Sequence, residues 1–426
     1  MKKTLMTILV SGLMFASCSK QETTDNPLLQ KWDTPFETAP FEKIKVEHYL
    51  PAFEAAMEEH NKEIQAIIDN AEAPTFDNTI AALDYAGETL SKVAGVFFNM
   101  MAANTSEELQ KVNEQVGPMM ATHSDNISMN AKLFEKIKAV YDAKDSQKYT
   151  GEQLALLEKT YNKFVRSGAL LDAAKQEELR KVNAELTKVE AKFDANLLKE
   201  SKAYQLVIDK EENLKGLPQG EIEKAAALAK EKGQEGKWIF TLDNPSFMPF
   251  VTYADNRDLR KEIFNARVNR CNNGGETDNN ALVAQMSELR AKKAQLLGYE
   301  TFAHYQLEER MAKEPKAVFD LLENLLSYSV KVAKEEAAQF QAMLSKDVPG
   351  ATLEAWDMYY YAEKVRQQKY NFDAELTRPY FEINNVRQGC FDVLTKLYGI
   401  SFTERKDISV YAEDVLAFEA KNEKGE

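Results

Sequence analysis

Metal ligation is the chemistry that histidine spacing would most readily reveal, and the chain has four histidines, His48, His60, His123 and His304. No two of them form the H-x-x-x-H arrangement that places two imidazoles on one helical face. His304 and Glu308 have i, i+4 spacing and could hold a metal with a distant third ligand. The same spacing is typical of a surface polar pair. His48 and His60 fall in a glutamate-rich segment, and His123 has no evident partner in the sequence.

Motifs for other kinds of catalysis are missing from the sequence. It contains no G-x-S-x-G nucleophile motif, no phosphate-binding P-loop and no G-x-G-x-x-G. Cys271 and Cys390 lie far apart without a histidine beside them, so we expect buried free thiols. The formal net charge of -14 would repel phosphate backbones, which excludes nucleic acid as a partner.

An aromatic cluster offers a candidate binding surface. Trp356, Tyr359 and Tyr360 would lie on about half the circumference of a helix, and Tyr380 follows in a separate segment. Tyrosine combines an apolar ring with a polar tip, so these four residues are possible peptide-groove residues. The alternative is that they pack in a core or an interface, and the composition of the cluster alone favours that alternative.

Helical periodicity runs through most of the chain, which predicts a mainly α fold with a few short strands. Segments with three-four apolar spacing are 44–68, 80–98, 109–120, 133–141, 154–164, 179–198, 280–297, 316–345, 353–370 and 385–398. Residues 204–208 and 238–242 alternate like two strands around a helix near 221–230. We expect a turn-rich connection at 244–249.

The first residues have the anatomy of an export sequence. Lys2 and Lys3 precede an apolar run that is too short to span a bilayer, which predicts a signal peptide at 1–17. The run ends at Cys18 in a sequence that resembles the lipobox of bacterial lipoproteins. We therefore expect lipidation of Cys18, a tether at 18–27, and a protein held in the bacterial cell envelope by a lipid anchor only. The alternative is an ordinary signal peptide with a cysteine nearby.

Several sequence blocks, in a fixed order, resemble the thimet oligopeptidase and dipeptidyl carboxypeptidase family. They are Trp238, Phe240-Thr241-Leu242, Pro245, Arg257 to Phe264, Asp278-Asn279-Asn280, Leu289-Arg290, Lys293-Ala294, Leu296 to Tyr299, Phe302-Ala303, Met311-Ala312, Trp356-Asp357-x-x-Tyr360-Tyr361, Tyr380 to Gly389, Leu397 to Ile400 and Phe402. The resemblance covers about residues 28–426 and is strongest to the bacterial dipeptidyl carboxypeptidases. Ordered blocks at sensible spacing are more specific than any single one.

The resemblance implies a large, neurolysin-like, two-lobed helical fold. We expect an N-terminal helical lobe at 28–200 and, at 201–426, a helical region with a short strand element that begins the peptidase domain. Family members hydrolyse short peptides with a zinc ion held by H-E-x-x-H and a later glutamate. That motif does not occur in this sequence, so no catalytic residue or zinc ligand can be assigned and no bound zinc is expected.

The last residues suggest an incomplete element. Residues 415–419 resemble a strand, and the polar turn at 421–425 would open a hairpin. From this we expect the N-terminal portion of an exported zinc peptidase, inactive alone. Its expected partners are short peptides, and a separate polypeptide is the candidate carrier of the zinc half. The alternative is a non-catalytic, membrane-tethered helical lipoprotein that binds peptides or acts as a scaffold.

Overall fold

A computed structural model describes residues 25–372 and 374–426. Most of these residues are helical and the described strands form only two small sheets, which confirms the mainly α prediction. The chain forms two compact units, one comprising residues up to 176 with Thr395–Glu426, and the other Glu177–Leu394. The lobe boundaries expected from the sequence stay a prediction. The signal peptide and Cys18 lie outside the described residues. Within these ranges, no helix combines the length and apolar character needed to span a bilayer.

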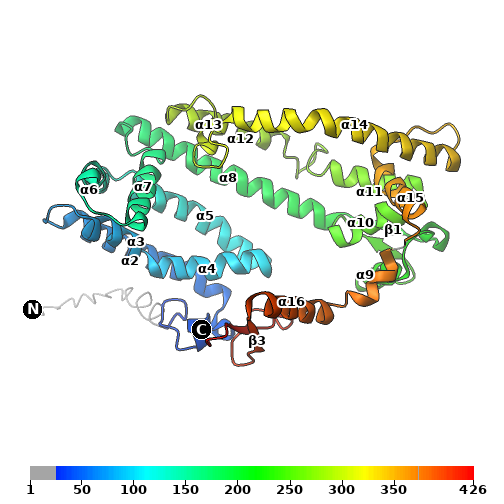
Figure 1. Cartoon of the computed structure of the whole chain (residues 1–426), viewed down its shortest axis with the longest axis horizontal. Coiled ribbons are helices and arrows are strands. Elements are labelled where there is room, and N and C mark those ends of the chain that lie inside the picture. The colour runs from blue at the N-terminus through cyan, green and yellow to red at the C-terminus, as the bar shows by residue number, and fades with distance from the viewer. Residues whose placement is uncertain (1–24, 373) are drawn as a thin grey trace, which may run out of the picture. The chain divides into compact units, whose positions relative to one another are not determined.

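The first unit is built mainly from helices (Figure 1). They are α2 (Tyr49–Asp69), α3 (Ala82–Tyr85), α4 (Glu88–Ala103), α5 (Glu107–Ser128), α6 (Ala131–Asp142) and α7 (Gly151–Arg166), with a π-helical turn, η4 (Phe76–Ala81), before α3. Capping residues in the sequence determine where two of these helices begin. The Thr75 and Ser106 side chains accept hydrogen bonds from backbone N–H groups at the starts of η4 and α5.

Apolar faces of α2, α4 and α5 form one core of this unit. Phe53 and Phe97 are fully buried there, with ring centroids 5.4 Å apart in an edge-to-face arrangement. A second core joins η4, α6 and α7 around Ile80, Ile137 and Leu157. Burial of such side chains is the main stabilising contribution to a helical body.

The single helix expected over 80–98 is broken, which corrects the sequence prediction. Gly87 separates α3 from α4 with φ +81°, a left-handed conformation that glycine adopts without a Cβ penalty. Its backbone N–H donates to the Glu63 carboxylate of α2 at 2.7 Å. Apolar spacing alone does not reveal the break, which separates Ile80 in the core with α6 and α7 from Phe97 in the core with α2 and α5.

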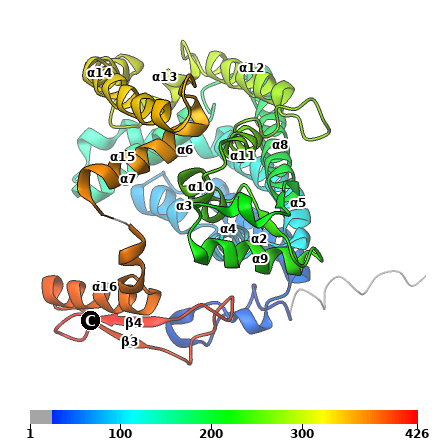
Figure 2. The same cartoon turned by 90° about the vertical axis from the view of Figure 1, so that its right-hand side faces the viewer.

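The strand expected at 415–419 lies further along the chain. Strand β4 covers Phe418–Lys421 and pairs antiparallel with β3 (Ser401–Glu404), as Figure 2 shows. Ser401 lies opposite Lys421, and Glu404 lies opposite Phe418. The partner strand therefore precedes β4 in the sequence, and a residue pattern at 415–419 alone could not identify it.

The second unit contains a small sheet and a further set of helices. Its elements are β1 (Leu206–Ile208), α9 (Gln219–Glu231), β2 (Trp238–Phe240), α10 (Asn244–Tyr253), α11 (Arg257–Val268), α12 (Asn280–Leu296), α13 (Phe302–Leu307), α14 (Pro315–Asp347) and α15 (Met358–Tyr370). Two further helices, α8 (Ala173–Ala203) and α16 (Ile383–Tyr398), run across the unit boundaries. Gly298 ends α12 with φ +85°, as its position in the sequence predicts.

The strand–helix–strand prediction is confirmed, and the connection after it is corrected. β1 and β2 pair antiparallel with Val207 opposite Ile239, and α9 lies between them in the sequence. The segment expected to be a turn-rich connection is instead helix α10. Pro245 occupies its first turn, where the missing N–H costs nothing, and Phe247 and Phe250 are buried.

Both cysteines of the described chain are free, but they differ in exposure. Cys271 is buried, as expected, and burial raises the pKa of its thiol. Cys390 is exposed on α16, so the prediction of two buried thiols is wrong for this residue. The Glu200 carboxylate accepts hydrogen bonds from the Cys271 N–H and the Thr277 hydroxyl, which ties the loop before α12 to the end of α8.

Candidate functional site

A buried ion cluster lies where α11 meets the start of α15. Arg257 donates from Nη2 to Asp357 Oδ2 at 2.7 Å and from Nε to Oδ1 at 3.0 Å. Arg260, only 1% exposed, donates from Nη2 to Asp357 Oδ1 at 3.2 Å and from Nη1 to the Ala254 carbonyl at 2.7 Å. Asn256 positions both arginines by capping α11. Two guanidinium groups thus share one fully buried carboxylate.

The environment of Asp357 keeps it ionised. Burial alone would raise the pKa of the Asp357 carboxyl, but hydrogen bonds from Arg257 and the Glu354 N–H outweigh burial and hold the pKa below its usual value. No substrate group is needed to complete these bonds. The geometry therefore indicates that Asp357 is a fixed structural anchor between α11 and α15, and that its carboxylate is not available as a general base.

Tyr360 extends this cluster on α15. Its hydroxyl donates to Asp255 Oδ1 at 2.8 Å, and the Arg260 guanidinium lies 3.9 Å from the ring centroid, within cation–π distance. Burial raises the pKa of Tyr360 above its usual value.

Gly216, with φ +88°, lets its own backbone lie close to that of Tyr253. A Cβ at this position would lie 2.2 Å from the Tyr253 carbonyl oxygen.

The four aromatic residues considered for a peptide groove differ strongly in exposure. Tyr360 is 6% exposed, whereas Tyr359 is 45% and Tyr380 is 77% exposed. Trp356 is half-buried, and the Lys261 ammonium lies 5.0 Å from its ring. The structure thus places Tyr360 in the ion cluster and leaves Tyr359 and Tyr380 accessible to a ligand.

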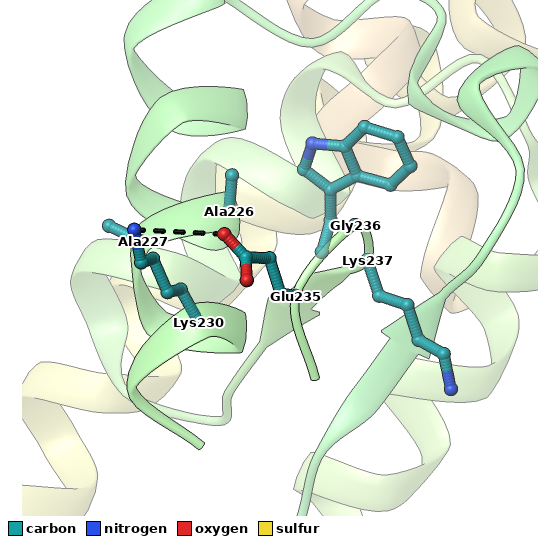
Figure 3. A pocket seen from close by; sticks show the side chains of 7 residues that line it. Ala226, Ala227, Lys230, Glu235, Gly236 and Lys237 are labelled. Carbon is teal, nitrogen blue, oxygen red and sulfur yellow. Dashed lines mark ion pairs between the residues drawn. The ribbon is translucent and has the colours of Figure 1, made fainter. Parts of the chain in front are cut away.

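A small cavity of about 280 Å³ lies between α9 and β2 (Figure 3). It is lined by Ala226, Ala227, Lys230, Glu235, Gly236, Lys237 and Trp238. The only carboxylate among these residues, that of Glu235, pairs with Lys230 at 3.7 Å. The cavity could hold a small apolar group beside an indole ring, but its polar side chains are exposed and already partly paired. None of the four aromatic groove candidates lines it.

The histidine and glutamate considered as metal ligands bind their neighbours instead. His304 Nδ1 lies 2.8 Å from the Thr301 hydroxyl, and its Nε2 lies 3.6 Å from Glu300. Glu308 accepts a hydrogen bond from the Tyr299 hydroxyl at 2.6 Å. Over residues 25–372 and 374–426, no group of three or more His, Cys, Asp or Glu side chains is arranged to hold a metal ion.

A histidine pair in the first unit was not foreseen from the sequence. His123 Nε2 lies 2.9 Å from His60 Nδ1, joining α5 to α2 across 63 residues. Burial lowers the pKa of both imidazoles; Lys163 lowers the pKa of His60 further, although Glu63 opposes this, and His60 lowers that of His123. At neutral pH the pair is uncharged, with one imidazole donating and the other accepting. Sequence gives no hint of this contact, because neither histidine is near the other along the chain.

The chain is similar to known peptidases. Residues 250–426 match the sequence model of peptidase family M3. The chain is 35% identical to dipeptidyl carboxypeptidase of Escherichia coli over 404 residues, covering 95% of this chain and 59% of that protein. It is 31% identical to oligopeptidase A of the same organism over 408 residues, or 94% of this chain and 59% of the relative. The chain therefore spans a little under three fifths of the length of these relatives.

Proposed function

We propose that this chain, which belongs to the family of thimet oligopeptidase and dipeptidyl carboxypeptidase, forms the helical part of an exported peptidase that hydrolyses short peptides. The observation that carries the proposal is the similarity to dipeptidyl carboxypeptidase, which extends over 95% of the chain. Similarity over so much of the length supports a shared fold and a shared class of substrate.

The part of the chain that the structure describes does not fit the zinc ion on which this family generally depends. Those residues hold no cluster of three or more potential ligands, and His304 and Glu308 are engaged elsewhere. We propose that the described residues bind and position a peptide.

The accessible aromatic side chains are the proposed peptide contacts. Tyr359 and Tyr380 are exposed and Trp356 is half-buried, so each can offer an apolar face to a peptide side chain. Tyr360 instead serves the ion cluster. Calorimetric titration with a mixture of short peptides tests this division. Tyr359→Ala should weaken binding about tenfold, whereas Tyr360→Phe, which keeps the ring, should change it less than twofold. Equal effects of the two substitutions would contradict the assignment.

Hydrolysis is tested with the chain by itself and with the chain joined to the rest of a relative. The purified chain, incubated with short peptides and zinc, should release no dipeptide detectable by mass spectrometry. A chimera of residues 25–426 with the part of the Escherichia coli dipeptidyl carboxypeptidase that lies outside the match should release dipeptides, and that part alone is the control. Peptide binding without hydrolysis by the chimera would favour the non-catalytic binding protein.

Export and anchoring are part of the same proposal. The lipobox-like sequence at Cys18 supports lipidation at the cell envelope. Growth of an expressing bacterium with an azide-labelled fatty acid should label the intact chain and the Cys390→Ala control, but not Cys18→Ala. A Cys18→Ala chain that still carries the label would overturn the lipid anchor.

A further inference from the structure

The N-terminal half of α14 exposes a long apolar surface. Phe319, Leu322, Leu325 and Leu326, here called the α14 stripe, are 60%, 54%, 52% and 58% exposed. Further exposed apolar side chains flank the stripe at Leu321, Tyr328 and Val332. Isolated apolar residues on a surface are ordinary, but a contiguous set of this kind marks an interaction site.

The same face of α14 is covered further along the helix. Phe340 follows Leu322 by 18 residues (340 − 322), and Leu344 follows Leu326 by the same interval (344 − 326), which is five turns of an α-helix. Phe340 and Leu344 are 9% and 0% exposed, respectively, and pack in one cluster with Tyr360 and Tyr361 of α15. One helical face is thus a packed core at its C-terminal end and open at its N-terminal end, and Figure 1 shows α15 beside only one end of α14.

The opposite face of α14 is suited to water. Asp320, Glu323, Asn324, Lys331 and Lys334 lie there and carry both signs of charge. A helix that is apolar on one side and mixed in charge on the other is typical of a helix packed against protein on its apolar side. The mixture of acidic and basic residues does not resemble the strongly basic face of helices that lie on anionic membranes.

We propose that the α14 stripe is the docking face for the part of the peptidase polypeptide that lies outside the similarity between this chain and its relatives. The match to peptidase family M3 at 250–426 includes all of α14. The similarity covers 59% of dipeptidyl carboxypeptidase, so 41% of that relative (100 − 59) is available as the occupant. This inference rests on the proposed function, because it takes the occupant of the stripe from the same family. A segment docked on the stripe would extend, toward the N-terminal end of α14, the core that α15 forms at the other end.

Hydrogen exchange of α14 in the chain and in the chimera described above tests the proposal. Peptides from 316–334 should exchange at least tenfold more slowly in the chimera than in the chain alone. The double variant Leu322→Glu, Leu326→Glu should remove this protection. The control Glu323→Gln, Lys331→Gln changes only the polar face and should preserve it.

If the chimera does not fold, a second experiment with two separate polypeptides tests the proposal. The full chain is mixed with the separately purified unmatched part of the Escherichia coli enzyme, and association is measured by light scattering and calorimetry. The stripe variant should weaken association at least tenfold and the polar-face control less than twofold. Equal association of all three chains, or no association of the wild-type chain, would overturn the proposal. So would protection of 316–334 by self-association of the chain, or by lipid vesicles, without the peptidase part.

The two readouts separate this inference from the proposed function. A chimera that releases dipeptides while 316–334 remains unprotected would contradict the docking face and leave the peptidase assignment standing. A chimera in which 316–334 is protected, but which cleaves no peptide, would support the docking face and contradict the peptidase assignment.

Discussion

The histidine pair of the first unit and the arginine–aspartate cluster of the second unit both bury nitrogen-rich side chains, but they differ in charge. His60 and His123 share one hydrogen bond and are uncharged at neutral pH. Arg257 and Arg260 carry two positive charges around the single carboxylate of Asp357. The stability that the neutral pair contributes is sensitive to pH near neutrality. The stability of the charged cluster requires all of its members, because an uncompensated buried charge is costly.

Removal of the carboxylate should have the largest effect. Asp357→Asn keeps the shape of the side chain but leaves the buried guanidinium of Arg260 without its counter-charge. We expect a loss of about 3–5 kcal/mol in the free energy of unfolding. Urea titration, followed by hydrogen exchange of peptides from α11, measures the loss. Asp320→Asn removes the same charge from an exposed pair with Lys316 and should have no measurable effect. Equal stabilities of the two variants would contradict the comparison.

A substitution at Gly87 should disturb the histidine pair through the backbone. Gly87 has φ +81°, and an added Cβ would lie 2.9 Å from the His60 ring. We expect Gly87→Ala to cost about 1–3 kcal/mol in the free energy of unfolding, since the alanine is strained and His60 must move. Gly95, in the interior of α4 with no atom near its missing Cβ, provides the control. Gly95→Ala should instead stabilise the chain by about 0.5–1 kcal/mol.

Acid should affect the two clusters in separate pH ranges. The folded pKa of each paired histidine lies below its ordinary value of 6.5, so the stability the pair contributes is complete above about pH 6.5 and is lost as pH falls toward the folded value. The pKa of Asp357 lies below its ordinary value of 3.8, so the stability from that cluster is lost only below about pH 4.

Hydrogen exchange of α2 and α5 between pH 7.5 and pH 5.5, corrected for the intrinsic exchange rate, measures the histidine contribution. The local opening free energy should fall measurably over this range in the wild-type chain, because protonation is disfavoured in the folded pair. The double variant His60→Gln, His123→Gln keeps polar groups that do not titrate and should show no such decrease. An equal decrease in the two chains would exclude the pair as its cause.

The smallest effect is expected at Tyr360. Tyr360→Phe removes the hydrogen bond to Asp255 but keeps the ring beneath Arg260. Because the Asp255 carboxylate is exposed to water, we expect a loss of about 0.5 kcal/mol in the free energy of unfolding. Urea unfolding measures it. A loss as large as that for Asp357→Asn would show that the hydroxyl, and not the ion pairs, holds the cluster together.

Sequence periodicity and capping residues predict most of the helices. Thr75, Ser106 and Gly298 mark helix ends where the structure has them. The predictions that fail are those that used only the preferences of neighbouring residues and not their burial. Residues 244–249 contain two prolines and a polar start, yet the burial of Phe247 and Phe250 favours a helix there.

The clusters themselves could not be predicted, because their members are distant along the chain. Arg257 and Asp357 are 100 residues apart, and no spacing rule connects them. Among the groove candidates, Tyr359 and Tyr360 occupy adjacent helical positions. Tyr360 is the buried one because it packs against Arg260 of α11 and against Phe340 and Leu344 of α14. The resemblance to a peptidase family identified the fold class without identifying these contacts.

The one-sided support of α14 has a consequence for the life of the chain in the cell. The turns around 319–334 have exposed apolar side chains and little tertiary packing, so we expect their backbone to open more often than that of the packed turns near Phe340. Frequent opening of an apolar segment makes it the preferred substrate of a protease. A chain whose α14 stripe stays uncovered would therefore be cut first in α14.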